Sequence, residues 1–201
     1  MQVTYAFDLN CPWTWITSRW LVGATAAVGD ELRWHPLSLA HLNEGRELPE
    51  RVRRNQATGR RAHRAVQWLL ERDRPADVAV LYEAYGTRVH RRGEERTAET
   101  LLAAIADAGL DDGVEAATQD ATLDAAVDAA TEEWVAAAGG DGGSPVIRFG
   151  DGPAFFGPLL EEVPGAAEGQ ALYRALATVT AVGPFISLQR GRPGQPRTST
   201  S

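Results

Sequence analysis

The hydrophobic pattern of the chain changes its period twice within the first 40 residues, and this limits the folds that it can adopt. Residues 3–9 alternate between apolar and polar positions and are rich in β-prone side chains, which predicts a strand. Apolar residues then recur at helical spacing from Trp13 to Leu21, after a proline at position 12 that suits a first helical turn. Residues 32–39 predict a second strand. A strand–helix–strand unit favours parallel pairing, so we expect an α/β domain.

The middle of the chain has a different pattern, which is helical almost throughout. Four or five short amphipathic helices follow one another and suggest an all-α insertion. A glycine-rich run at 139–143 ends this part, residues 144–156 predict two short strands joined by a hairpin turn, and a last helix is expected over 168–182. We therefore expect one α/β domain from 1–48 and 139–189, a helical insertion at 49–138, and a disordered tail at 190–201.

Composition and charge exclude several classes of function. The 201 residues carry 20 basic and 27 acidic side chains, and the formal charge of −7 at pH 7 disfavours binding to nucleic acid. No segment approaches the roughly 20 apolar residues that span a bilayer, and the N-terminus lacks a signal-peptide pattern. We therefore expect a cytoplasmic protein without a membrane partner. The single cysteine excludes an internal disulfide, and no Cys/His cluster predicts a metal site.

That single cysteine, Cys11, is the strongest candidate for a catalytic residue. It lies between the first predicted strand and the helix that Pro12 begins. A helix N-terminus carries unpaired N–H groups and a partial positive charge, which stabilise a thiolate. Thr14 could offer both its hydroxyl and its N–H to the sulfur, so we expect a lowered pKa for Cys11. The alternative is that Cys11 is a small buried apolar residue, as free cysteines often are.

Several segments of the chain resemble one protein family. Residues 11–15, Cys-Pro-Trp-Thr-Trp, resemble the Cys-Pro-Trp-Cys active site of DsbA-like thioredoxin-fold proteins. The longer run at 11–20 is similar to one branch, the mycothiol-dependent nitroreductases, and nearly the whole chain outside the tail follows the same pattern. The supporting segments lie at 38–44, 86–90, 144–147 and 154–158. The resemblance implies a thioredoxin-like fold with an all-α helical insertion.

The resemblance also implies a set of residues around the catalytic Cys11. Pro145 matches a proline that is cis in this fold and would face Cys11, leaving the backbone of Ser144 to pair with a thiol substrate. Trp13 could stack on an aromatic substrate, whereas Trp15 is expected in the core. The complete set expected to bind substrate or thiol is Pro12, Trp13, Thr14, Asn43, His90, Ser144 and Pro145.

The chain departs from the family pattern at Thr14, which occupies the position of the second active-site cysteine. A cycle with an internal disulfide is therefore excluded, and a monothiol cycle through a mixed disulfide or a sulfenic acid remains. The resemblance implies an oxidoreductase that uses mycothiol to reduce small electrophiles such as nitro compounds or disulfides. No flavin or nicotinamide site is recognisable, so a separate mycothiol-disulfide reductase would recycle the thiol.

Two other functions stay open at this point. One is a thiol-dependent isomerase or transferase of the kappa glutathione transferase type, although those enzymes commonly have serine where this chain has Cys11. The other is a non-catalytic thioredoxin-fold binding protein in which Cys11 is inert. The sequence also leaves the oligomeric state open, with a homodimer as one option.

Overall fold

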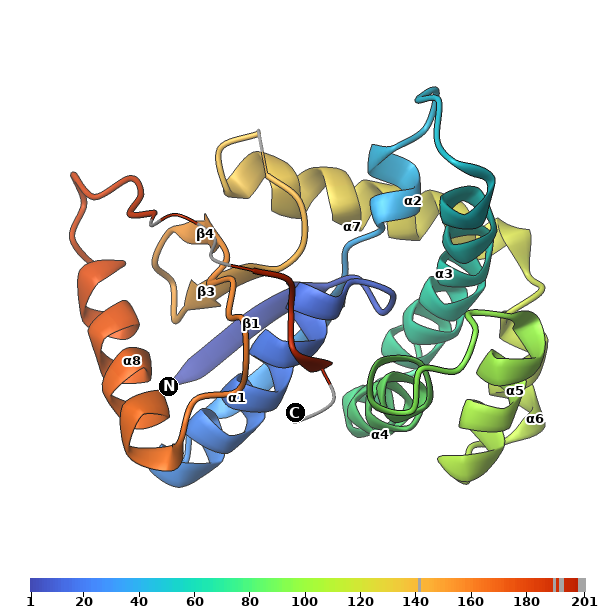
Figure 1. Ribbon diagram of the computed structural model, residues 1–201, viewed down its shortest axis with the longest axis horizontal. Coiled ribbons are helices and arrows are strands. Elements are labelled where there is room, and N and C mark those ends of the chain that lie inside the picture. The colour runs from blue at the N-terminus through green and yellow to red at the C-terminus, as the bar shows by residue number, and fades with distance from the viewer. Residues whose placement is uncertain (141, 190, 192–193, 199–201) are drawn as a thin grey trace.

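The computed structural model describes residues 1–140, 142–189, 191 and 194–198. Its centre is a four-stranded sheet in the order β2-β1-β3-β4. Figure 1 labels β1, β3 and β4 of this sheet. Strands β1 and β2 are parallel, and β3 is antiparallel to both β1 and β4. The strands are β1 (Gln2–Phe7), β2 (Glu31–Pro36), β3 (Val146–Phe149) and β4 (Ala154–Phe156). The parallel strand–helix–strand unit that the sequence predicted is thus confirmed.

Helices cover both faces of this sheet. Helix α1 (Pro12–Val28) connects β1 to β2 and contacts α8 (Ala166–Val179). On β1, Tyr5 and neighbours on the same face belong to the main core, whereas Ala6 packs in a second cluster with Trp134 of α7 (Asp124–Ala137). This alternation between two buried faces explains why β1 is apolar along most of its length.

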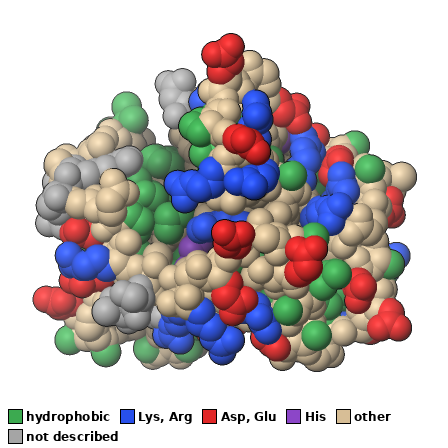
Figure 2. Space-filling model, turned by 45° about the vertical axis from the view of Figure 1, so that its right-hand side comes forward, with side chains coloured by type: hydrophobic (Ala, Val, Ile, Leu, Met, Phe, Trp, Pro, Cys, Tyr) green, Lys and Arg blue, Asp and Glu red, His purple; other side chains and the backbone are tan. Residues whose placement is uncertain are grey.

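Every element between Glu50 and Ala137 is helical. Helix α3 begins at Glu50, at the start of the helical insertion expected over 49–138. Its first half carries arginines, and Arg60 and Arg64 form ion pairs with Asp124 and Asp128. Figure 2 shows arginines interspersed with acidic side chains over this part of the surface. The elements are α3 (Glu50–Leu70), α4 (Pro75–Gly86), the π-helix η1 (Thr87–Arg91), α5 (Ala98–Asp107), α6 (Asp112–Ala117), η2 (Ala121–Leu123) and α7.

Strand β2 ends at Pro36, three residues earlier than expected. The hydroxyl of Ser38 accepts the N–H of His41 and so caps the short helix α2 (Leu39–Leu42). The Ser144–Pro145 bond is cis, as expected, and Gly157–Pro158 is also cis. Within the described part of the chain, no helix is long and apolar enough to cross a membrane.

The expected tail at 190–201 lies partly outside the described residues. Of the part that is described, Arg197 donates its N–H to the carbonyl of Glu161 and pairs with the carboxylates of Glu161 and Glu162. This segment therefore has contacts with the folded domain that the composition of the tail did not indicate.

Gly86 allows α4 to approach α1 closely. A side chain at this position would overlap the ring of Trp15, which is fully buried at the start of α1. Trp15 also packs on Tyr82 and stacks on the ring of His90 at a centroid distance of 5.6 Å. Because residue 86 has no side chain, α4 can pack closely against α1, the helix that follows Cys11.

Replacing Gly86 by alanine should destabilise the protein by about 1–3 kcal/mol, because the added methyl group overpacks the core against Trp15. The matched control is Gly23→Ala in α1, where an added methyl group meets nothing within 4 Å. That control should stabilise the helix by roughly 0.5–1 kcal/mol. Urea unfolding followed by tryptophan fluorescence measures both, and equal effects would contradict the packing argument.

Candidate functional site

Cys11 is the residue that immediately precedes α1, as the sequence predicted. Its backbone is extended, its N–H donates to the carbonyl of Asp8 at 3.2 Å, and its carbonyl accepts the N–H of Trp15 at 3.0 Å. The residue is only 8% exposed. Its sulfur lies 3.9 Å from the carbonyl oxygen of Ser144, which accepts the thiol proton. The cis peptide between Ser144 and Pro145 therefore lies beside the reactive sulfur.

Ser144 and Thr14 meet next to Cys11 through their hydroxyl groups. The N–H of Asp8 donates to the Ser144 Oγ at 2.7 Å, and this Oγ lies 2.9 Å from the Thr14 Oγ1. All of these side chains are buried. The structure thus brings together four of the predicted site residues, namely Cys11, Thr14, Ser144 and Pro145.

The direction of these hydrogen bonds decides what Thr14 can do. A backbone N–H can only donate, so the Ser144 Oγ accepts from Asp8, and the hydroxyl proton of Ser144 can be donated to the Thr14 Oγ1. The Thr14 hydroxyl proton is then available to the Cys11 sulfur, and this hydrogen bond favours the thiolate. The N–H groups of Thr14 and Trp13 also favour the thiolate.

The expectation of a lowered pKa for Cys11 is nevertheless wrong for this structure. Burial raises the pKa of the thiol above its ordinary value, and the nearby charge of Asp8 adds to the effect. The hydrogen bonds from Thr14 and from the N–H of Trp13 oppose this rise without cancelling it. The sequence showed the helix N-terminus but could not show how little solvent reaches the sulfur.

Asp8 is a site residue that the sequence analysis missed. Its Oδ1 accepts the N–H of Asn10 and its Oδ2 accepts the N–H of Leu39, both at 2.8 Å. The ring of His63, from α3, lies 3.3 Å from the same Oδ2. Burial alone would raise the pKa of Asp8, but these hydrogen bonds hold it below its ordinary value. A buried carboxylate thus joins the Cys11 loop to α2 and α3.

Asn10 makes a second connection to the helical part of the chain. Its Nδ2 donates to the carbonyl of Asn55 at 2.6 Å, and its Oδ1 accepts the hydroxyl of Tyr85 at 2.7 Å. Arg96 donates to its carbonyl oxygen. The sequence shows an asparagine directly before the cysteine, but it does not show the hydrogen-bond partners of this residue, which are 45 to 86 residues away.

His90 lies close to the Cys11 loop, although its ring is buried. Its Nε2 donates to the carbonyl of Leu9 at 2.9 Å, and its Nδ1 lies 3.5 Å from a nitrogen of Arg96. Only 5% of the residue is exposed, and burial lowers the pKa of its ring to about 4. A neutral imidazole with both nitrogens engaged holds the loop in place, so we assign His90 a positioning role.

The other predicted residues are less buried than Cys11. Pro12 and Trp13 are half-buried at the start of α1, whereas Trp15 is fully buried. Asn43 follows α2 and accepts a hydrogen bond from Arg46 at 3.3 Å. The described contacts of Asn43 therefore connect it to its own loop and not to Cys11.

One group of side chains has the composition of a metal site. His41, Glu44 and Asp128 place one ligand-type atom each within 4.8 Å of one another. However, Arg60 forms ion pairs with both Glu44 and Asp128, and the His41 ring lies 3.2 Å from Asp128. Because a guanidinium already forms ion pairs with both carboxylates, we assign this group to ion pairing between α2, α3 and α7.

Replacing Thr14 by valine should lower the reactivity of Cys11, because the thiolate loses a hydrogen-bond donor. Hydrogen bonds to charged groups contribute about 1.5–3 kcal/mol, so alkylation by iodoacetamide at pH 7 should slow by about tenfold or more. The Thr14→Ser variant keeps the hydroxyl and is the control. The alkylation midpoint of the unchanged protein should lie above the roughly 8.5 of a free thiol. An equal rate in the valine and serine variants would contradict the hydrogen-bond relay.

The buried neutral His90 should make the protein less stable in acid. Its pKa is about 4 in the folded protein and about 6.5 in the unfolded chain, so the unfolded chain binds more protons between these values. Stability should therefore be complete above pH 6.5 and fall by up to about 3 kcal/mol as the pH drops to 4. In His90→Gln the amide can still donate to Leu9, and this part of the pH dependence should vanish. The urea midpoints of the unchanged protein and of His90→Gln, measured at several pH values, test this prediction. Parallel pH dependences of the two proteins would refute a buried neutral His90.

Comparison with proteins of known fold agrees with this arrangement. SCO1869 from Streptomyces coelicolor, a probable DsbA oxidoreductase, aligns with a TM-score of 0.59 at 19% identity over 96% of this chain and 94% of its own. The cytosolic disulfide reductase DsbM from Pseudomonas aeruginosa has a TM-score of 0.57 at 18% identity over 89% and 99%. A 2-hydroxychromene-2-carboxylate isomerase reaches 0.58 at 16% identity over 89% and 95%. At these identities the likeness shows a DsbA-like thioredoxin fold, as expected.

Sequence comparison goes further than the fold. The uncharacterized protein Rv2286c of Mycobacterium tuberculosis is 30% identical in an alignment over 200 residues that covers 94% of this chain and 81% of that protein. A family model described as mycothiol-dependent nitroreductase Rv2466c matches residues 10–190, which include Cys11, Thr14, His90, Ser144 and Pro145. The protein is therefore a thiol-dependent oxidoreductase of the DsbA-like type, and it belongs to the Rv2466c-like family of mycothiol-dependent nitroreductases.

Proposed function

We propose that Cys11 is a monothiol nucleophile that uses mycothiol to reduce small disulfides and nitro compounds. The observation that carries this proposal is the place of the Cys11 sulfur, 3.9 Å from the Ser144 carbonyl, with Thr14 where the resolving cysteine would be. The membership of the family supports mycothiol as the co-substrate and a cytoplasmic location. A mycothiol-disulfide reductase would be the partner that regenerates the thiol.

With a disulfide as substrate, the reaction consists of two exchanges. The Cys11 thiolate attacks one sulfur, forms a mixed disulfide and releases the other half as a thiolate. A mycothiol thiolate then attacks the mixed disulfide, which frees Cys11 and forms a mycothiol disulfide. Because Cys11 is the only cysteine in the chain, an external thiol must carry out the second step.

With a nitro compound, two thiols supply the two electrons and two protons. Cys11 and one mycothiol reduce the nitro group to a nitroso group and water, and they become joined as a mixed disulfide. A second mycothiol then releases Cys11, so that one mycothiol disulfide forms per nitro group. The nucleophile in each step is a thiolate, so the rate should rise with pH toward the raised pKa of Cys11.

The surrounding residues support this chemistry in different ways. The backbone of Ser144 precedes the β3 ladder, which begins at Val146, and can pair with an amide of the thiol co-substrate. The Thr14 hydroxyl stabilises the thiolate that leaves when the mixed disulfide is resolved. Trp13, with Pro12 beside it, is half-buried and can stack on an aromatic nitro compound. Asn43 would bind the outer part of the thiol.

Incubation with mycothiol disulfide should add one mycothiol to the protein, as measured by intact-protein mass spectrometry. Glutathione disulfide should add to a smaller fraction of the protein under the same conditions, and Cys11→Ser should gain no adduct. The Thr14→Cys variant should release the adduct and keep an internal disulfide, because the residue 14 side chain lies against the sulfur. Two free thiols in this variant after mild oxidation would contradict the geometry.

The products formed from a nitroaromatic compound separate reduction from group transfer. Reduction yields mycothiol disulfide and a nitroso or further reduced compound, whereas a transferase joins the thiol to the ring as a thioether. Thioether formation without mycothiol disulfide would overturn the proposed reaction. An unreactive Cys11 would favour a binding protein instead.

A further inference from the structure

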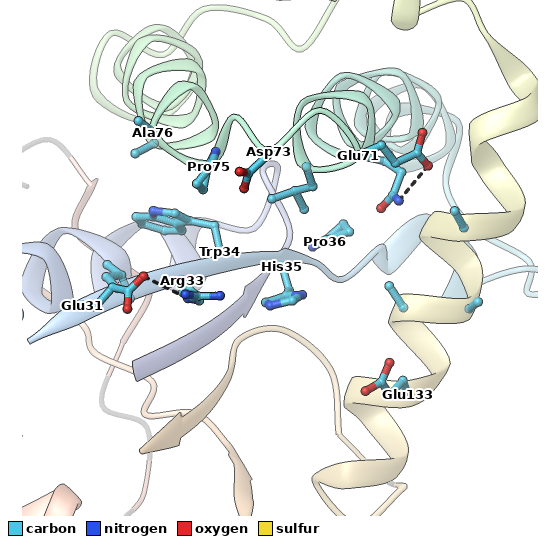
Figure 3. A pocket seen from close by; sticks show the side chains of 17 residues that line it. Glu31, Arg33, Trp34, His35, Pro36, Glu71, Asp73, Pro75, Ala76 and Glu133 are labelled. Carbon is cyan, nitrogen blue, oxygen red and sulfur yellow. Dashed lines mark hydrogen bonds and ion pairs between the residues drawn. The ribbon is translucent and has the colours of Figure 1, made fainter. Parts of the chain in front are cut away.

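A groove follows the free edge of the sheet, away from Cys11. Its volume is about 1040 Å³, and its floor is β2 (Figure 3). Helices α3 and α4 form one wall, with Gln67, Leu70 and Ala79 among its residues, and α7 forms the other. None of the residues proposed to act in thiol chemistry lines this groove.

The floor offers backbone hydrogen-bonding groups that the sheet does not use. Strand β2 is at the edge, with β1 as its one neighbour among the described residues. The N–H groups of Glu31 and Leu37 donate to the carbonyls of Met1 and Phe7, on the β1 side, and the direction alternates along a strand. The N–H and C=O groups of Leu32 and Trp34 consequently face the groove. An extended peptide could therefore pair with this edge.

The walls leave room for the side chains of such a peptide. On α7, three small residues at helical spacing, Ala126, Ala129 and Ala130, line the groove, and Ala129 is exposed. The opposite wall contributes Ala76 and Ala79 from α4. In a strand added to β2, alternate side chains would point toward these two walls.

The charge around the groove indicates which peptide fits. Glu31, Glu71, Asp73 and Glu133 are acidic, whereas Arg33 is the one arginine in the lining and already pairs with Glu31. Asp73 and Glu133 form no ion pair within the described part of the chain. A second copy of the protein would bring these acidic rims together, which like-charge repulsion disfavours.

We propose that this groove binds an extended, basic peptide segment of a partner protein as an added strand next to β2. The edge of β2 supplies backbone hydrogen bonds, the alanines leave space for aliphatic stems, and the acidic rim pairs with cationic ends. Main-chain hydrogen bonds with β2 set the register of the peptide, and the acidic rim favours arginine or lysine at alternate positions of the peptide.

A labelled peptide of sequence Arg-Val-Arg-Val-Arg-Val tests this proposal by fluorescence anisotropy. It should bind the protein, whereas the Glu-Val-Glu-Val-Glu-Val peptide should not. A peptide with the same charges but with N-methylated backbone amides should bind at least tenfold more weakly. Equal binding of the methylated peptide would overturn the proposal, because charge alone would then explain the affinity.

Two arginine substitutions on the same helix locate the site. Ala129→Arg places a cation inside the groove and should weaken binding at least tenfold, whereas Ala125→Arg, at an exposed position outside it, should not. Equal losses in both variants would overturn the proposal. So would a dimer of the unchanged protein that Ala129→Arg dissociates, because a second copy would then occupy the edge.

Amide exchange of the bound peptide complex gives a readout independent of affinity. The Leu32 and Trp34 amides should exchange more slowly when the peptide is bound, and those of Arg33 and His35 should not change. Cys11→Ser should bind the peptide as the unchanged protein does, which keeps this test separate from the thiol chemistry. Slower exchange spread over all four amides would contradict strand addition.

Discussion

The buried carboxylate of Asp8 holds together the parts of the chain that form the site. It follows β1, accepts N–H groups from Asn10 and Leu39, and lies beside His63 of α3. A buried charge of this kind is stable only when hydrogen bonds replace the water that it has lost. The loop before Cys11, the start of α2 and the helical part of the chain are therefore positioned by the same side chain.

Asp8 also affects the chemistry of Cys11 in two opposite ways. The negative charge of its side chain disfavours the thiolate, whereas its backbone N–H donates to the Ser144 hydroxyl, which can donate in turn to Thr14 and leave the Thr14 proton for the sulfur. Burial adds to the first effect and keeps the resting cysteine protonated. This balance between effects that disfavour and favour the thiolate suits an enzyme with a single active-site thiol, because an unprotected thiolate without a resolving cysteine is open to irreversible oxidation.

The Cys11 site and the acidic groove lie at different parts of the sheet. The Cys11 site lies where β1 meets the turn before β3, and the acidic groove lies along β2 on the other side of β1. The β1–α1–β2 unit could be predicted because its periodicity is local, whereas the ion pairs of the α3 arginines could not, since their partners are distant residues of α7. The groove could not be predicted from the sequence either, because its walls come from three segments that are far apart in the chain.

The amino-acid pattern alone predicted the strand–helix–strand start and the place of Cys11 before α1, and resemblance to the family predicted the cis bond at Pro145. Each of these depends on neighbouring residues or on a motif. The upward shift of the Cys11 pKa, the burial of His90 and the hydrogen bonds that converge on the Asp8 carboxylate follow only from the folded structure. These properties depend on how much solvent reaches a group and on partners tens of residues away, because desolvation and long-range hydrogen bonds arise only when the chain is packed.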